Sequence, residues 1–111
     1  MPFDKSPIYS LLMHASALGN HRRVLELLDG GEDVNQVGPR NSSALMFAAS
    51  GGHLEIVKTL TERGAHLFAR EDGGWTALLH AQADNYTEVV RYLEDEMSAC
   101  RQERRLPKNS G

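Results

Sequence analysis

Apolar residues recur through the middle of the chain at the spacing of short amphipathic helices. The stretch from Ser43 to Ala65 reads SALMFAASGGHLEIVKTLTERGA, and in it Leu45, Ala48 and Ala49 lie three to four residues apart. This spacing places the three side chains on one face of a helix. A second apolar stripe with helical spacing lies beyond the glycine pair. The pattern therefore predicts two short helices with a tight turn between them.

Residues that begin and end helices stand where this pattern needs them. Ser43 precedes the first apolar residue and can cap the helix by accepting a backbone N–H. Gly51 and Gly52 are expected to end the first helix and Gly64 the second, because glycine adopts helix-closing backbone conformations at little cost. Each helix is too short to be stable alone in water, so its apolar face must be buried against a neighbour.

The same pattern recurs at a fixed interval. The segments LMHASALGNHRRVLEL, LMFAASGGHLEIVKTL and LLHAQADNYTEVVRYL begin at Leu12, Leu45 and Leu78, and both 45 − 12 and 78 − 45 equal 33. Several columns hold one residue type in all three copies: Leu12/Leu45/Leu78, Ala15/Ala48/Ala81, Val24/Val57/Val90 and Leu27/Leu60/Leu93. Because each copy has apolar faces that it cannot bury alone, the copies are expected to stack side by side.

Two further columns indicate local backbone geometry. Capping residues precede the first helix in each copy, at Ser10, Ser43 and Thr76. The turn inside each copy holds Gly19, Gly52 or Asn85. Glycine adopts a left-handed backbone at no steric cost and asparagine at a small one. We therefore expect a left-handed residue at the same point of every unit.

In period and in residues, these copies resemble ankyrin repeats. The family pattern is T-P-L-H-x-A-A-x-x-G-H-x-x-V-V-x-L-L followed by G-A-x-x-N. The second copy matches it through Leu45, Ala48, Ala49, Gly52, His53, Val57, Leu60, Gly64 and Ala65. The Pro and His of T-P-L-H are replaced in all three copies. The resemblance implies an all-α repeat solenoid, an ankyrin-type stack of helix–turn–helix units joined by hairpin loops.

The resemblance also suggests how the chain is divided. We expect a single ankyrin-repeat domain over residues 1–106, followed by a disordered tail at 107–111. The expected repeats are 6–38, 39–71 and 72–105. The third copy holds Met97 where the earlier copies hold Gly31 and Gly64, so its second helix should continue. Polar residues along this extension suit a C-terminal cap of the stack.

Composition and charge exclude several classes of function. The chain of 111 residues is 41% hydrophobic with a net charge of −3, which gives no long-range attraction to nucleic acid. No apolar run approaches the ~18 residues of a membrane span, and the N-terminus lacks the pattern of a secretory signal. Cys100 is the sole cysteine, which suits a reducing compartment. We expect a cytoplasmic or nuclear protein without nucleic-acid or membrane partners.

No catalytic residue, metal site or cofactor is predicted. The histidines are His14, His21, His53, His66 and His80, and no H-x-x-x-H spacing joins any two of them. The glycine pairs are not followed by the Lys-Ser/Thr of a phosphate-binding loop. Cys100 lies on the expected cap, where a small apolar role suffices. We therefore expect a non-catalytic protein.

The resemblance implies that the first helices and hairpin turns line a concave face that binds a protein partner. The residues expected there are Tyr9, His14, Leu18, Arg40, Phe47, Arg70, Asp72, Trp75 and His80. Aromatic residues and arginine are enriched in binding hot spots. Alternatively, Trp75 and Phe47 pack against neighbouring repeats, and Tyr9 makes a contact that caps the chain end.

Two other functions stay open at this point. The segment LLDGGEDVN resembles the ankyrin-loop context used by asparaginyl hydroxylases, which makes Asn35 a candidate modification site. The alternative is that Asn35 only shapes its turn through bonds to the backbone. The chain can also be a piece of a larger ankyrin scaffold. We expect a monomer, with the apolar first helix as the surface through which copies would associate.

Overall fold

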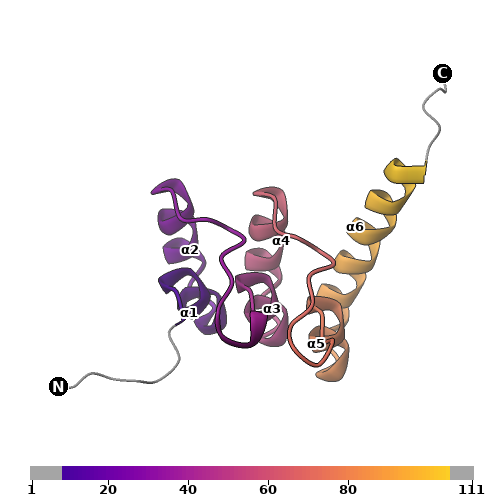
Figure 1. The fold of residues 1–111 in the computed structure, drawn as a ribbon, viewed down its shortest axis with the longest axis horizontal. Helices are drawn as coiled ribbons and strands as arrows, with labels where there is room; N and C mark the ends of the chain where they lie inside the picture. Colours follow the sequence, from indigo (N-terminus) through magenta and orange to yellow (C-terminus); the bar gives the residue numbers. More distant parts are fainter. Residues whose placement is uncertain (1–8, 106–111) are drawn as a thin grey trace.

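The computed structural model describes residues 9–105, and their side chains as far as residue 100. Within this part of the chain all regular structure is helical, which confirms the predicted all-α stack (Figure 1). The elements are α1 (Leu11–Leu18), α2 (His21–Asp29), the 3-10 turn η1 (Pro39–Asn41), α3 (Ala44–Ser50), α4 (Leu54–Glu62), α5 (Ala77–Ala83) and α6 (Thr87–Arg105). The expected tail at 107–111 and the start of the first repeat lie outside the described residues.

Each first helix begins at the predicted capping residue. The side chains of Ser10, Ser43 and Thr76 each accept the backbone N–H of the residue three positions on. The N–O distances are 3.1 Å in the first and third units and 3.3 Å in the second. Each bond satisfies one of the free N–H groups at a helix start, which helps so short a helix to form.

The turn inside each unit has the predicted left-handed residue. The φ angles are 80° at Gly19, 73° at Gly52 and 61° at Asn85. At two of these positions glycine is also needed for space. A Cβ atom on Gly19 would lie 2.6 Å from the His53 ring, and one on Gly52 would lie 2.6 Å from the Tyr86 ring. In the second and third units, therefore, the ring of the turn lies against the glycine of the preceding unit.

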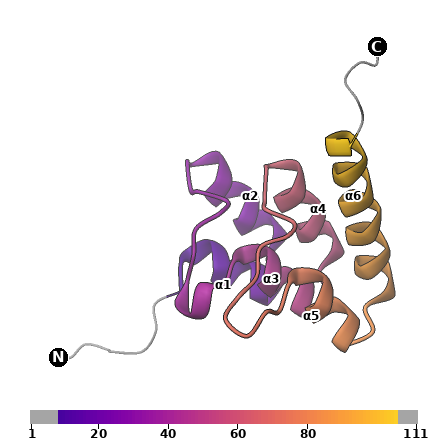
Figure 2. The ribbon, with the colours of Figure 1, turned by 45° about the vertical axis from the view of Figure 1, so that its right-hand side comes forward.

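The helices form two rows that run along the stack. The first helices α1, α3 and α5 are neighbours in one row, and α2, α4 and α6 form the other (Figures 1 and 2). The core lies between these rows and between units. It contains the repeated columns, with Leu12, Leu45, Val57 and Leu60 at most 2% exposed. The columns thus correspond to core positions that are buried in the first two units, whereas Leu78 and Val90 of the third unit are partly buried against the same core.

The third unit differs from the others on its outer face. In one column Met13 and Met46 are 2% and 3% exposed, whereas Leu79 is 42% exposed. In another column Gln82 is exposed where the second unit has the buried Ala49. Helix α6 also continues past the point where glycines close the earlier units. The outer face of this unit is thus solvated and partly polar.

Side-chain bonds join successive units outside the core. The Arg63 guanidinium lies 2.8 Å from the Asp29 carboxylate, which links α4 to α2. His21 and the Thr59 hydroxyl are 2.8 Å apart and link the same two helices. The His53 imidazole donates to the backbone carbonyl of Ala17 at 3.2 Å. These contacts fix how the second unit lies on the first.

Candidate functional site

Two hairpin loops fold back beside the first helices. In the earlier loop the Gly38 N–H donates to the Ser42 carbonyl at 2.8 Å. In the later loop the Glu71 N–H donates to the Trp75 carbonyl at 2.9 Å. These residues are equivalent, since 38 + 33 = 71 and 42 + 33 = 75. The two loops are therefore copies of one hairpin, each closed immediately before the cap of its first helix.

The tips of the two hairpins have the same backbone shape but different residues. Arg40 and Asn41 have φ angles of 61° and 62°, and the equivalent Gly73 and Gly74 have φ angles of 91° and 88°. Two successive left-handed residues are typical of a tight hairpin turn, where glycine is favoured. The first tip thus places an arginine side chain where the second has none.

The two tips are joined to each other. The Asp72 N–H donates to the Arg40 carbonyl at 2.9 Å. The Asn41 side-chain amide donates to the Asp72 carboxylate at 2.8 Å. Both bonds cross from one hairpin to the next, so the tips form one continuous edge. This edge holds Arg40 in a fixed place above the first helices.

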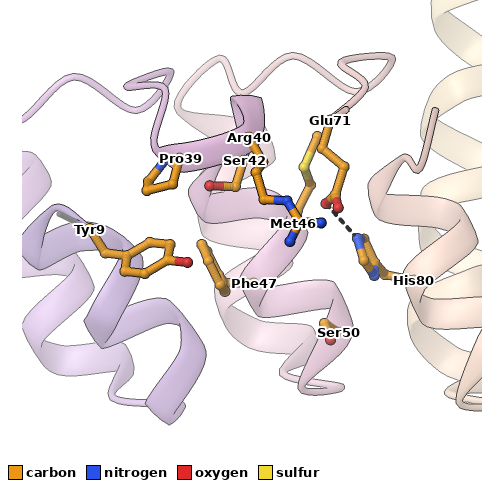
Figure 3. Close-up of a pocket in the computed structure, with 9 residues that line it drawn as sticks. All are labelled: Tyr9, Pro39, Arg40, Ser42, Met46, Phe47, Ser50, Glu71 and His80. Carbon is orange, nitrogen blue, oxygen red and sulfur yellow. Dashed lines mark hydrogen bonds and ion pairs between the residues drawn. The ribbon is translucent and has the colours of Figure 1, made fainter. Parts of the chain in front are cut away.

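A hollow of about 180 Å³ lies below this edge. It is lined by Tyr9, Pro39, Arg40, Ser42, Met46, Phe47, Ser50, Glu71 and His80, shown in Figure 3. One wall is aromatic, since Tyr9 and Phe47 meet edge to face with ring centres 5.4 Å apart and planes at 88°. This is a favourable geometry for two aromatic rings. The hollow therefore has a rigid apolar side.

The opposite wall is polar. The His80 Nε2–H donates to the Glu71 carboxylate at 2.8 Å, and both side chains are about a quarter exposed, at 24% and 23%. The Trp75 ring lies against the His80 imidazole, with the ring centres 5.1 Å apart and the planes at 34°. His80 is thus contacted both by the Glu71 carboxylate and by an aromatic ring.

The Arg40 side chain enters the hollow from above. In Figure 3 its guanidinium points between Phe47 and His80. Among the described residues, the salt bridges and side-chain hydrogen bonds include no partner for this guanidinium. The hollow therefore combines an apolar wall, a hydrogen-bonded acid and a cation that has no partner among the described residues.

The structure brings together most of the residues that the sequence predicted for this face. Four of them line the hollow: Tyr9, Arg40, Phe47 and His80. Two lie beside it, since His14 is 6.1 Å from Tyr9 and Trp75 is 5.1 Å from His80 between ring centres. Arg70 and Asp72 are exposed in the second hairpin. Leu18 ends α1 and is 78% exposed, but it does not line the hollow.

The other lining residues are not among those predicted to bind a partner. They are Pro39, Ser42, Met46, Ser50 and Glu71. Glu71 is the most informative of these, because it stands in the column where the preceding hairpin has Gly38. An alignment of the repeats shows a charged residue where the earlier unit has glycine, and this difference could have marked Glu71 as a candidate site residue. Its hydrogen bond to His80 depends on how the hairpin folds back.

The predicted modification site lies elsewhere, in the loop that follows α2. The Asn35 side-chain amide donates to the Gly64 carbonyl at 3.0 Å, and its oxygen accepts the His66 N–H at 2.9 Å. Its own backbone N–H donates to the Asp33 carboxylate at 2.9 Å. Asn35 therefore makes side-chain bonds to the backbone, as expected for a residue that shapes a loop. Both of these side-chain bonds go to the loop of the next unit and not to its own turn.

The hollow does not have the geometry of a catalytic triad. A triad histidine is oriented by a carboxylate on Nδ1 and activates a hydroxyl through Nε2. Here Nε2 of His80 is taken by Glu71, and in the described part of the chain no hydrogen bond joins His80 to Ser50. The described residues contain no group of three His, Cys, Asp or Glu that could hold a metal ion.

Ionisation is perturbed away from this site. Burial raises the pKa of the Tyr92 phenol on α6, and the neighbouring Glu96 carboxylate raises it further. Tyr92 lies on the second helix of its unit and does not line the hollow.

Across residues 9–105, no helix is both long enough and apolar enough to cross a membrane.

Known proteins similar to this chain share its repeats. A family profile described as ankyrin repeats in three copies matches residues 12–103. The mouse protein "Ankyrin repeat and SAM domain-containing protein 6" is 36% identical over 84 residues, which are 74% of this chain and 10% of that protein. The Caenorhabditis elegans "E3 ubiquitin-protein ligase hecd-1" is 40% identical over 88 residues, which are 77% of this chain and 3% of that protein.

A solved structure shows the same architecture. The crystal structure of the human ASB11 ankyrin repeat domain superposes with a TM-score of 0.76 and 32% sequence identity. The match covers 78% of this chain and 39% of that chain. This chain spans a tenth or less of the length of the mouse and nematode relatives, so the similarity reaches only a small part of each.

Proposed function

The chain belongs to the ankyrin repeat family, and from that premise we propose that it is a non-catalytic module that binds a protein partner. The proposed surface is the concave face formed by the hairpin tips and the first helices. Ankyrin repeats are in general protein-interaction modules. The fold alone does not name a partner, so the surface has to be argued from its own residues.

The observation that carries the proposal is the group of incompletely buried aromatic residues along this face. Tyr9 and Phe47 are half-buried, and Trp75 is 42% exposed. None of the three is among the buried core residues, although Tyr9 and Phe47 pack against that core. Large aromatic side chains that remain accessible in a fixed geometry are typical of binding hot spots. A protein partner would bury them.

The size of the hollow favours protein side chains over a small-molecule ligand. Its volume of about 180 Å³ is below the roughly 300 Å³ at which ligand pockets usually begin. A hollow of this size can receive one or two side chains of a partner segment. The rest of that segment would then lie along the hairpin tips, where Arg70 and Asp72 are exposed.

Affinity capture from a lysate of the natural source tests this proposal. The unmodified chain is immobilised beside Trp75→Ala and beside Arg22→Gln, which changes an exposed residue on α2. We expect a protein retained by the unmodified chain and by Arg22→Gln but depleted on Trp75→Ala. The measured Kd of that protein should rise about tenfold or more, because truncation of a hot spot costs about 2 kcal/mol.

The melting temperature of each variant decides between binding and core packing. If Trp75→Ala or Phe47→Ala collapses stability while the remaining folded protein keeps its affinity, the aromatic residues are core residues and the proposal is wrong. If stability is retained and affinity is lost, these residues contact the partner.

The alternative function, modification of Asn35 by an asparaginyl hydroxylase, needs a conformational opening. Both groups of the Asn35 amide are bonded to the next loop, so an enzyme would have to release them first. Intact-mass measurement of protein from its natural source tests this alternative. An added oxygen atom that maps to Asn35 would support it, and an unmodified mass would remove its basis.

The relatives also bear on the context in which this module works. Because the matched segment is 10% and 3% of their lengths, a role as part of a larger ankyrin scaffold is a further proposal.

Self-association is the last proposed function, since α1 presents Leu11 and Leu18, which are 57% and 78% exposed. Light scattering at several concentrations would detect it, and Leu18→Ser should abolish it.

A further inference from the structure

We infer that the hollow receives an acidic segment of a partner protein, with a carboxylate at Arg40 and an adjacent apolar side chain against Tyr9 and Phe47. This inference rests on the proposed function, because it assumes that the face binds protein. It goes further by assigning the charge and chemistry of the segment. Three features of the face support it: its acids are already bonded, its arginines have no bonded partner in the described part of the chain, and one arginine has a strained backbone.

The acidic groups of this face are engaged within the molecule. The Glu71 carboxylate accepts the His80 imidazole N–H at 2.8 Å. The Asp72 carboxylate accepts the Asn41 amide at 2.8 Å. A basic partner would have to compete for these carboxylates with donors already in place. The face is therefore less suited to a lysine or arginine than its two acids suggest.

The cationic groups are not engaged. Among the described residues no salt bridge or hydrogen bond is made by the guanidinium of Arg40 or by that of Arg70. Other arginines do have carboxylate partners, since Arg23 pairs with Glu26 and Arg63 with Asp29. Although the whole chain has a net charge of −3, the charged groups of this face that have no partner among the described residues are these two guanidinium groups.

The backbone at Arg40 gives independent support. Its φ angle of 61° lies in the left-handed region, where any side chain with a Cβ atom is disfavoured. The equivalent tip residue is Gly73, which adopts the same turn without this cost. Strain held at an exposed position suggests a functional side chain. Because no described residue uses the guanidinium, its use is expected outside the molecule.

The chemistry of the segment follows from the geometry of the hollow. A guanidinium binds a carboxylate through two parallel N–H···O bonds, which fixes orientation as well as charge. In Figure 3 the Arg40 guanidinium and the Phe47 ring face the same hollow. One Asp or Glu flanked by a Leu, Met or aromatic residue would satisfy both groups. The required segment is thus acidic with apolar neighbours, not uniformly charged.

A random twelve-residue peptide library displayed on phage provides the probe. The library is selected on the unmodified chain, and enriched peptides are synthesised with a fluorescent label. Their Kd values are measured by fluorescence anisotropy on the unmodified chain, Arg40→Gly and Arg22→Gln. Arg40→Gly removes the side chain but keeps the turn, since Gly73 shows that glycine fits it. Arg22→Gln removes the same charge from the exposed surface of α2.

We expect the enriched peptides to contain Asp or Glu beside an apolar residue. Arg40→Gly should weaken their binding at least about tenfold without lowering the melting temperature, and Arg22→Gln should leave it unchanged. Replacing the peptide carboxylate with an amide should weaken binding to the unmodified chain by a similar factor. The same replacement should have little effect on Arg40→Gly, because the two groups act as a pair.

The other outcomes separate this inference from the proposed function. If peptides bind and depend on Trp75 but not on Arg40, or if they are basic, the face binds protein and the acidic segment is wrong. If no peptide is enriched on the unmodified chain, both the binding face and the acidic segment are contradicted.

Discussion

The second and third units have nearly the same sequence pattern but different surroundings. Met46 in the second unit is 3% exposed because a neighbour covers it, whereas its equivalent Leu79 in the third is 42% exposed. The second unit closes with Gly64 at a φ of 96°, and the third continues as α6 to Arg105. The sequence pattern therefore determines the helices, while neighbouring units determine how much of each helix is buried. This difference can be tested at four levels.

The largest difference is expected in the leucine column. Leu45 is 2% exposed, so Leu45→Ala should cost about 2–5 kcal/mol of unfolding free energy through lost burial and a cavity. Leu78 has the same place in the third unit but is only half-buried, and Leu78→Ala should cost less than about 2 kcal/mol. Urea denaturation of both variants measures the difference. Equal costs would show that the end unit is packed as tightly as the middle one.

The next effect is expected at the loops between units. Asn35 makes two hydrogen bonds to the following loop, so Asn35→Ala should cost about 1–2 kcal/mol. The equivalent position in the next loop is Phe68, whose side chain contains no amide group. Asn35→Asp keeps the acceptor but loses the donor, and its carboxylate would face the Gly64 carbonyl. A denaturation midpoint unchanged in both variants would mean that these bonds add no stability.

At the hairpin tips we expect two smaller effects on stability, which are opposite in sign to each other. Arg40→Gly should raise the free energy of unfolding by up to about 1 kcal/mol, because the left-handed strain is removed. Gly73→Ala should lower it by about 1 kcal/mol for the converse reason. Thermal unfolding followed by circular dichroism compares the two. Changes of the same sign would contradict the interpretation that the tips share one turn geometry.

The smallest effect is expected for surface ion pairs. The Arg22 side chain is 86% exposed and lies 3.9 Å from Glu26 in the same helix, so Arg22→Gln should change stability by less than about 0.5 kcal/mol. Arg63 joins two units through a 2.8 Å contact with Asp29, and Arg63→Gln should cost up to about 1 kcal/mol. Raising the salt concentration should reduce the cost of Arg63→Gln. An Arg22 effect as large as that of Arg63 would contradict the special role of contacts between units.

The helices and their boundaries could be predicted because their causes are local. Ser43 bonds to a residue three positions away, and Gly52 can adopt its left-handed φ angle without steric cost. The repeated columns then predict burial, since each column meets the same column of the next unit. For this reason the stack could be recognised from the residues alone.

The hollow could be predicted only in part. Phe47 and His80 share a column on the first helices, so their common face followed from the repeat. The bond between Glu71 and His80 could not be predicted, because it depends on how the hairpin folds back over its own helix. Leu18 is on the expected helix but at its last turn, away from the hollow. Asn35 was predicted to be a modification site or to shape its own turn, whereas its side chain bonds to the next loop.

The contact of the His53 ring with Gly19, and of the Tyr86 ring with Gly52, has a consequence for extending the stack by design. A unit added after the third would bring its own turn ring to Asn85, whose Cβ occupies the space that Gly19 and Gly52 leave open. Asn85→Gly would therefore have to accompany any grafted repeat, together with an apolar replacement for Gln82. On this reasoning the units are not interchangeable building blocks, because the position of each glycine determines which neighbour it can accept.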